Sequence, residues 1–307
     1  MRVFVTGASG HIGSALVPEL SGAGHEVVGL ARSDESAAAL TAAGAAVHRG
    51  TLEDLESLRD AARSADGVIH LAFNHQANDW RDAAAVNHRA IEAIGAVLEG
   101  TGIPFVVTSG TLTLLAAGLP AGRTGTEEDA VDPATQQPRA ASETTVSRLG
   151  ERGVRSSVVR LAPTVHSTLD HHGFIPTLIQ IARSNGFSAY VEDGANRWPA
   201  VHTLDAANLF RLALEKAPAG SRWHAAADEG VPFRTIAETI GKHLGLPAVS
   251  IPRDQAEAHF GFLAIAVPAD NPTSSARTRE VLGWNPVHPG LLEDLEQGHY
   301  FQLPVPA

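Results

Sequence analysis

Residues 2–6 form a run of β-favouring side chains that leads directly into three glycines, Gly7, Gly10 and Gly13. A helix-like segment follows at 14–23, and a second β-favouring run follows at 25–31. In a strand–turn–helix unit of this kind, the first glycine permits a tight turn, the second lets phosphates approach the backbone, and the third lets the helix pack closely on the strand. The helix N-terminus offers free N–H groups and partial positive charge to a pyrophosphate. The pattern predicts a dinucleotide-binding turn; the alternative is an ordinary glycine-rich turn.

Short apolar runs alternate with helical segments through the first half of the chain. Such βαβ units predict an α/β fold, a Rossmann-type doubly wound parallel sheet with right-handed crossovers. Strands are expected at 2–6, 25–31, 45–48, 67–72, 103–109 and 154–161. Helices are expected at 12–23, 35–43, 53–64, 81–100 and 139–150, with a long loop at 116–138.

The second half of the chain follows a different pattern. A loop is expected at 163–170, helices at 174–185, 203–217 and 233–245, and a strand at 222–227. We therefore expect residues 1–162 to form the nucleotide-binding domain, with 203–227 returning to it. Residues 163–202 and 228–307 are expected to form a smaller substrate-binding region that caps the carboxyl edge of the sheet.

Composition excludes several classes of function. The net charge of −11 argues against a nucleic-acid partner, because phosphate binding needs clustered cations. Cysteine is absent and only two lysines are present, Lys216 and Lys242, which leaves few candidates for thiolate or lysine catalysis. No apolar run reaches the ~18 residues of a membrane span. The first strand begins at residue 2, which leaves no room for a signal peptide, so a cytoplasmic location is expected.

Motifs beyond the glycines carry a resemblance that spans nearly the whole chain. They are T-G-x-x-G-x-x-G at 6–13, D-x-V-I-H-L-A at 66–72, Asn87, V-V-T-S-G at 106–110, R-L-x-P at 160–163, V-H-x-x-D-A-A at 201–207 and L-G-W-x-P at 282–286. With these motifs the chain resembles the extended short-chain dehydrogenase/reductases of the nucleoside-diphosphate-sugar epimerase type. The resemblance implies a Rossmann domain with a smaller substrate domain. It also implies a possible homodimer formed through the helices at 81–100 and 139–150.

The chain departs from this family at its catalytic pair, Tyr-x-x-x-Lys. Arg139 stands where the tyrosine is expected, and Glu143 stands where the lysine is expected. Neither of the two tyrosines, Tyr190 and Tyr300, has a lysine four residues later. The usual catalytic Ser or Thr aligns with Gly110. The chain is therefore identified as an atypical member whose mechanism differs from the standard one.

The end of the second predicted strand favours NADP over NAD. NAD-binding relatives place a carboxylate there for the ribose 2′-hydroxyl. This chain has Arg32 and Ser33, and a guanidinium suits a 2′-phosphate. A solvent-facing arginine is the alternative, and Asp34 is a competing acid two residues later.

The resemblance implies further cofactor contacts. Thr51 and Leu52 would border the adenine, Ala72 and Phe73 would lie near the pyrophosphate and ribose, and Ser109 and Pro163 would flank the nicotinamide. Glu143 would either bond the nicotinamide ribose or pair with Arg139, four residues away on one helix. The remaining expected cofactor contacts are Thr6, Gly7, Ser9, Gly10, His11, Ile12, Gly13 and Leu71.

A reductase without the tyrosine needs another proton donor near the carbonyl oxygen. Thr111, His166 and Tyr190 are the candidates, because a hydroxyl or imidazole at the sheet's carboxyl edge or in the capping region can donate a proton. For Thr111 the alternative is a loop cap, and for His166 a structural histidine.

Substrate contacts are expected from the loops and the capping region that border the ligand crevice. For Trp198 the alternative is core packing, and for His202 it is an interface hydrogen bond. No metal site is expected, because His166, His171 and His172 lack a completing ligand set. The expected substrate-binding residues are His75, Trp80, Gly110, Arg197, Trp198 and His202.

Together these observations favour an NADP-dependent oxidoreductase that acts on a small organic carbonyl or alcohol with a proton donor other than tyrosine. Two alternatives stay open. One is an NADP-binding sensor without catalysis, which the missing Tyr and Lys would fit. The other is an epimerase or isomerase that uses transient hydride transfer.

Overall fold

The computed structural model describes residues 1–74, 79–116, 118–120, 122–132 and 138–302. Its main element is a seven-stranded parallel sheet with the order β10-β6-β5-β4-β1-β2-β3. The strands are β1 (Arg2–Thr6), β2 (Glu26–Ala31), β3 (Ala46–Arg49), β4 (Gly67–His70), β5 (Pro104–Gly110), β6 (Arg155–Leu161) and β10 (Ser221–Ala225). The strand order reverses between β1 and β4, and ligands bind at the carboxyl ends of strands around such a reversal.

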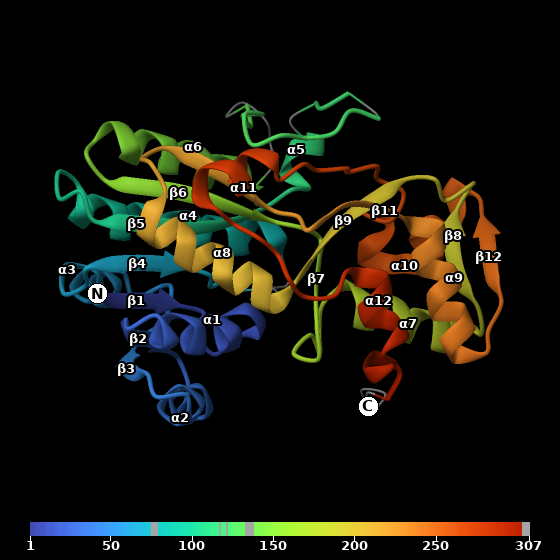
Figure 1. Ribbon diagram of the computed structural model, residues 1–307, viewed down its shortest axis with the longest axis horizontal. Coiled ribbons are helices and arrows are strands. Elements are labelled where there is room, and N and C mark those ends of the chain that lie inside the picture. Colours follow the sequence, from blue (N-terminus) through green and yellow to red (C-terminus); the bar gives the residue numbers. More distant parts are fainter. Residues whose placement is uncertain (75–78, 117, 121, 133–137, 303–307) are drawn as a thin grey trace.

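Helices cover both faces of the sheet, as Figure 1 shows. One face packs against α1 (His11–Gly22), α2 (Asp34–Ala42) and α8 (Thr203–Lys216). The other face packs against α3 (Leu55–Arg63), α4 (Trp80–Leu98) and α6 (Pro138–Glu151). The short helix α5 (Thr113–Ala116) follows β5. The expected Rossmann-type fold is therefore confirmed. The strands carry apolar residues on both faces, and these residues need a helical layer on each side of the sheet.

A smaller region lies at one end of the large sheet, and β7 and β9 lead into it (Figure 1). It has its own core, built around α7, α9, β8 and β9. Its strands are β7 (Thr164–His166), β8 (Ser188–Val191), β9 (Arg197–His202), β11 (Asp228–Pro232) and β12 (Ala248–Ile251). Its helices are α7 (Phe174–Asn185), α9 (Phe233–Leu244), η1 (Arg253–Gln255), α10 (Ala256–Phe260), η2 (Gly261–Ala264), α12 (Leu291–Glu296) and η3 (His299–Gln302).

The second half of the chain corrects two expectations. The expected loop at 163–170 contains β7, which pairs in parallel with β9, a strand that the sequence pattern did not predict. The helix α11 (Ala276–Leu282) and Trp284 pack against the core on the face of the large sheet that α1 and α8 cover, although this stretch was expected in the smaller region. The pairing of β7 and the packing of α11 each involve residues that are far away along the chain. No helix in the described part of the chain has the length and apolar character that a bilayer crossing requires.

Candidate functional site

The glycine-rich turn between β1 and α1 has the geometry that its sequence predicts. Gly7 has φ of +70°, and a Cβ there would lie 2.7 Å from the backbone nitrogen of Ala72. A Cβ on Gly13 would lie 2.2 Å from the carbonyl oxygen of Gly7. Gly10 is the exposed N-cap of α1, with extended backbone and no side chain over the helix N-terminus. The turn therefore presents a bare helix N-terminus at the carboxyl edge of the sheet.

Thr6 supports this turn from below instead of facing a ligand. It is fully buried, and its Oγ1 lies 2.9 Å from Nδ1 of His70 and accepts from the backbone nitrogen of Ala72. Nε2 of His70 lies 2.9 Å from Oδ1 of Asn87 on α4. Burial lowers the pKa of His70 to about 4, so the ring is neutral near pH 7. The expected cofactor contact of Thr6 is thus corrected to a role in holding the loop.

The expected adenosine end contains a second cation that the sequence pattern did not single out. Arg32 is exposed directly after β2, and the Ser33 hydroxyl caps α2 by accepting from the backbone nitrogen of Ser36. The competing acid, Asp34, forms an ion pair with Arg49 at the end of β3. Thr51, a little further along the chain, is exposed. Leu52 packs against the core on the face of the sheet that α3 and α4 cover. The Asp34 carboxylate is therefore partly neutralised.

Glu143, which the resemblance aligns with the family lysine, belongs to a buried ion pair. Glu143 on α6 receives hydrogen bonds from Nη2 of Arg160 at 2.6 Å and from Nε of Arg160 at 3.1 Å and 3.2 Å. Ser109 donates to Oε1 of Glu143 at 2.6 Å, and Thr113 donates to the same atom at 3.3 Å. Glu143 is 5% exposed and Arg160 is fully buried. The partner of Glu143 is therefore Arg160 instead of Arg139, and its carboxylate is engaged within the protein instead of facing a ribose.

Arg139, which the resemblance aligns with the family tyrosine, lies at the first turn of α6. Its guanidinium carbon lies 4.2 Å from the ring centre of Phe73 and 5.7 Å from that of Trp80. The two rings contact each other with centroids 4.5 Å apart. Nη1 of Arg139 lies 3.4 Å from the carbonyl oxygen of Thr108 near the end of β5. Burial lowers the pKa of Arg139 to about 10, so it remains a cation near pH 7.

Thr111 lies one residue beyond β5, as expected, but it is fully buried. Its Oγ1 accepts a 2.8 Å hydrogen bond from Nδ2 of Asn271, a residue 160 positions later that sequence reasoning missed. Asn271 is also fully buried, and its Oδ1 has no hydrogen-bond partner among the described residues. Gly110 ends β5 and is partly exposed. The segment that carries Asn271 covers Thr111, so the hydroxyl is not available to a substrate in this conformation.

His166 ends β7 and is likewise fully buried. Its Nδ1 lies 2.9 Å from Oδ2 of Asp294 on α12, and its Nε2 has no hydrogen-bond partner in the described part of the chain. The ring contacts His202 edge-to-face with centroids 5.6 Å apart. His202 caps α8 by accepting from the backbone nitrogen of Leu204 and stacks on His288. These two histidines form a domain junction instead of an open donor and a substrate contact.

His11 links this histidine junction to the glycine-rich turn. Its Nε2 lies 2.8 Å from Oγ1 of Thr203, and its Nδ1 lies 3.9 Å from Oδ1 of Asp170. Burial lowers the pKa of His11 to about 4 and raises the pKa of Asp170 to about 6. Asp170 also accepts from the backbone nitrogen of Gly173 before α7 and from the hydroxyl of Tyr300. The glycine-rich turn is thus connected through hydrogen bonds to the start of the first helix of the smaller region.

Three expected site residues lie within the smaller region. Trp198 is fully buried between Phe174 and Phe233, which corrects its expected substrate contact to core packing. Tyr190 belongs to β8 in the same core, away from the end of the large sheet in Figure 1, so it is not placed as a proton donor. Arg197 forms a bidentate pair with Asp270, at 3.0 Å and 2.8 Å. The structure does not bring these three together with the glycine-rich turn.

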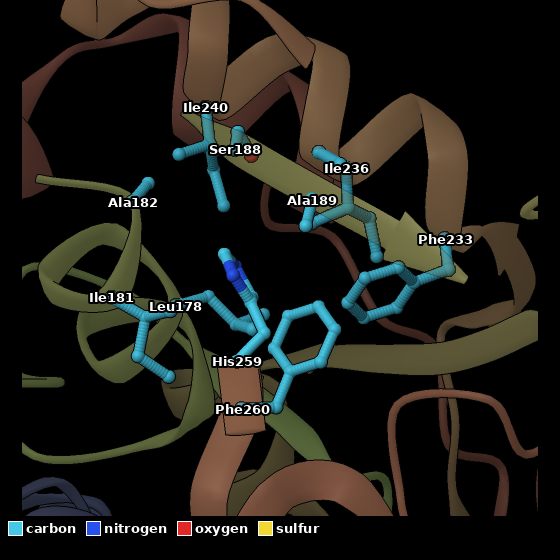
Figure 2. A pocket seen from close by; sticks show the side chains of 11 residues that line it. Leu178, Ile181, Ala182, Ser188, Ala189, Phe233, Ile236, Ile240, His259 and Phe260 are labelled. Atoms are coloured by element: carbon cyan, nitrogen blue, oxygen red, sulfur yellow. The ribbon is translucent and has the colours of Figure 1, made fainter. Parts of the chain in front are cut away.

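The smaller region also contains a small apolar cavity (Figure 2). Its volume of about 10 Å³ admits about one water molecule. The cavity is lined mainly by aliphatic residues of α7 and α9, with His259 and Phe260 on one side. It is too small for an organic substrate.

The remaining expected site residues lie beside the segment 75–78 or around the glycine-rich turn. His75 lies outside the described residues, whereas Trp80 is 44% exposed beside Phe73. Within the described ranges no three acidic, histidine or cysteine side chains form a group that could hold a metal ion. Ser9 is exposed at the turn, and Ile12, Leu71 and Pro163 are partly exposed around it. Asp294 and Asn271 carried no local sequence signal, because their partners lie more than a hundred residues away.

Comparison with known proteins agrees with this geometry. Residues 3–226 match the model of the NAD dependent epimerase/dehydratase family. The chain is 50% identical over 301 residues to "Uncharacterized protein C2A9.02" of Schizosaccharomyces pombe, covering 98% of this chain and 100% of that protein. It is 29% identical over 276 residues to a 4-hydroxy-2-methyl-3-oxo-4-farnesyl-3,4-dihydroquinoline-1-oxide ketoreductase of Stigmatella aurantiaca, covering 85% and 80%.

Solved structures show the same fold. The UDP-glucose 4-epimerase of Thermus thermophilus in complex with NAD superposes with a TM-score of 0.70 at 21% identity, covering 98% of this chain and 99% of that one. That solved structure, which has the same fold, contains bound NAD. The glycine-rich turn, the parallel sheet and the family match together show that this chain belongs to the NAD dependent epimerase/dehydratase family, of the short-chain dehydrogenase/reductase type.

Proposed function

We propose that the protein is an NADP-dependent oxidoreductase that interconverts a small organic carbonyl compound and its alcohol. The observation that carries this proposal is the intact glycine-rich turn, whose bare helix N-terminus and close backbone contacts suit a dinucleotide. The relative named as a ketoreductase supports the reaction class. Arg139 and Glu143 stand where the resemblance expects the Tyr and Lys, so the proposed mechanism uses a proton source other than that tyrosine.

When bound, NADPH would supply the hydride that the carbonyl carbon accepts, and one proton at the oxygen would complete the alcohol. The C=O π bond would become a C–O single bond, with NADPH as the two-electron reductant. Thr111, His166 and Tyr190 are all buried in this structure. Water that enters with the substrate is therefore the proton source that we propose. The protein contributes orientation and electrostatic stabilisation of the developing alkoxide.

The proposed preference for NADP rests on the exposed guanidinium of Arg32 and on the pairing of Asp34 with Arg49. We expect Arg32→Ala to reduce the preference for NADPH over NADH by about 10- to 100-fold, the effect of losing a charge-assisted phosphate contact. Titration calorimetry with both cofactors measures this ratio. Arg63→Ala, which removes an exposed arginine at the end of α3, is the matched control. An unchanged ratio in the Arg32 variant contradicts the assignment.

One observation favours the second candidate, a protein that binds NADP without turnover. The buried Arg160–Glu143 pair occupies the position at which the family lysine acts, so that part of the catalytic machinery is absent. Such a protein would use the cofactor as a signal.

Deuteride transfer separates the two candidates. The protein is incubated with 4-deuterated NADPH and a panel of aldehydes, ketones, quinones and 2-oxo acids, and the products are analysed by mass spectrometry. Deuterium in a product alcohol is the expected result. Tight NADPH binding without label in any product contradicts the oxidoreductase and supports the sensor.

A further inference from the structure

The ring of His11 lies beside the N-terminus of α1, where the pyrophosphate of a dinucleotide is expected to bind. His11 is the first residue of α1, and its N-cap, Gly10, has no side chain to occupy the free backbone N–H groups of that turn. Nε2 of His11 lies 2.8 Å from Oγ1 of Thr203. Nδ1 of the same ring lies 3.9 Å from Oδ1 of Asp170. The two ring nitrogens of His11 therefore face different partners.

The hydrogen bonds of Thr203 fix the tautomer of His11. The Thr203 hydroxyl donates its one proton to the carbonyl oxygen of His166 at 3.1 Å, and its oxygen accepts from Oγ of Ser167 at 2.8 Å. Because the Thr203 proton is already used, Nε2 of His11 must be the donor in the contact between the two side chains. A neutral imidazole carries one N–H, so Nδ1 of His11 is an unprotonated acceptor.

Asp170 presents a second acceptor to this nitrogen. Its carboxylate is buried, with Oδ1 accepting from the backbone nitrogen of Gly173 at 2.7 Å and Oδ2 accepting from the hydroxyl of Tyr300 at 3.2 Å. Nδ1 of His11 and Oδ1 of Asp170 thus face each other as two acceptors, and within the described residues no hydrogen bond satisfies Nδ1. One added proton turns this contact between two acceptors into one between a donor and an acceptor.

The surroundings of this pair favour the uptake of a single proton. Burial raises the pKa of Asp170 to about 6 and lowers the pKa of His11 to about 4, so the pair binds its first proton in the range in which most carboxylates stay ionised. Because the two groups are close, this proton belongs to the pair. The other titratable groups that face the pair or its hydrogen-bond partners are His171 before α7, His166 on β7, His202 before α8, Asp294 on α12 and Tyr300 on η3.

We propose that His11 and Asp170 form a proton-binding site that links dinucleotide binding to pH, so that the dinucleotide binds together with one proton on this pair. This inference rests on the dinucleotide binding that the proposed function requires. A pyrophosphate would bring negative charge to the α1 N-terminus beside the Asp170 carboxylate, and one proton on the pair offsets the charge of that carboxylate. By linkage, the affinity for the dinucleotide then rises as the pH falls from 8 toward 6.

The test measures proton uptake when NADP⁺ binds to the full chain. Calorimetry at pH 6.5 in two buffers of different ionisation enthalpy gives the number of protons taken up, and titrations between pH 6 and 8 give the affinity. The wild type is compared with Asp170→Asn, which keeps an acceptor for Gly173 but cannot ionise. Asp254→Asn, at an exposed aspartate on η1, is the control. The 2′-phosphate of NADP⁺ also titrates near pH ~6, but it is common to all the proteins, so the difference between them reports the pair.

We expect the wild type and Asp254→Asn to take up about 0.5 to 0.9 proton more than Asp170→Asn. Between pH 6 and 8 their affinity for NADP⁺ should fall about 10-fold further than that of Asp170→Asn. A second measurement needs no variant to fold. Nitrogen-15 spectra of the wild-type histidine rings are expected to show the Nε2–H tautomer of His11 at pH 8, and the titration of the His11 signals is expected to move to higher pH when NADP⁺ binds.

Equal proton uptake by the wild type and Asp170→Asn, the same pH dependence of affinity in both, or an Nδ1–H tautomer of His11 would overturn the inference. The outcome is separable from that of the proposed function. Proton uptake that depends on Asp170 without deuteride transfer keeps the proton site and removes the oxidoreductase. Deuteride transfer with no difference between the two proteins keeps the oxidoreductase and removes the proton site. Absence of NADP⁺ binding at every pH removes both.

Discussion

Two buried polar clusters border the edge of the large sheet, and they handle charge in opposite ways. The ionic cluster consists of Arg160, Glu143, Ser109 and Thr113, and its charges are matched by a bidentate pair and two hydroxyl donors. The histidine junction consists of His11, His166, His202, Asp170 and Asp294, where burial lowers the pKa of His11 and of His202 to about 4. The ionic cluster keeps its charges because the two ions are paired with each other. In the histidine junction, burial favours the neutral form of the His11 and His202 rings.

The difference shows which cluster responds to its surroundings. A fully paired ion pair has little to gain from a ligand and is costly to break from one side. Imidazoles that are neutral only because they are buried respond to pH and to any opening of the junction. The ionic cluster is therefore expected to be a fixed support, and the histidine junction is expected to be the acid-labile contact between the cofactor turn and the smaller region.

Breaking the ionic cluster from one side is expected to have the largest effect on stability. Glu143→Gln leaves Arg160 buried without a counter-charge, so we expect the free energy of unfolding to fall by about 3–5 kcal/mol. Urea denaturation followed by circular dichroism measures this change. The double variant Glu143→Met with Arg160→Met is expected to recover most of the loss, because it removes both charges together. A loss below about 1 kcal/mol in the single variant would show that the pair is not a buried support.

Acid is expected to weaken the histidine junction next. His11 and His202 have folded pKa values of about 4, below the unfolded value of 6.5, so the unfolded chain binds more protons in between. Their contribution to stability is complete above pH 6.5 and is lost as the pH falls toward 4. Asp170, with a folded pKa raised to about 6, acts in the opposite direction over part of this range, but it is one group against two histidines with lowered pKa values. We therefore expect the free energy of unfolding to decrease between pH 6.5 and 4.

The variant His202→Asn isolates one member of the junction, because asparagine retains an acceptor for the N-cap of α8. Each proton that binds only to the unfolded state contributes a slope of about 1.4 kcal/mol per pH unit. The slope of unfolding free energy against pH should be smaller in His202→Asn than in the wild type by up to that amount. Urea titrations between pH 4.5 and 7 measure both slopes. Equal slopes would show that His202 titrates alike in the folded and unfolded chain.

The smallest effect is expected from the anchor of His166. Asp294→Asn keeps an acceptor for Nδ1 of His166 but removes the negative charge, so we expect a loss of about 1 kcal/mol. Thermal unfolding at pH 7.5 measures it, with Asp254→Asn on the exposed 3₁₀ helix η1 as the control. A loss as large as that of Glu143→Gln would mean that the junction is ionic as well, which would remove the contrast between the two clusters.

The local sequence pattern determined the alternation of strands and helices, the glycine-rich turn and the bounds of helix 174–185, because each depends on residues that are close along the chain. The resemblance read from the sequence also aligned Arg139 and Glu143 with the family's catalytic Tyr and Lys. Only the tertiary structure decided which partners these residues have. Glu143 pairs with Arg160 from the neighbouring strand β6, Thr111 bonds Asn271, and His166 bonds Asp294. Such pairs depend on how strands and helices pack, and burial then sets whether a side chain is charged, neutral or hidden from a ligand.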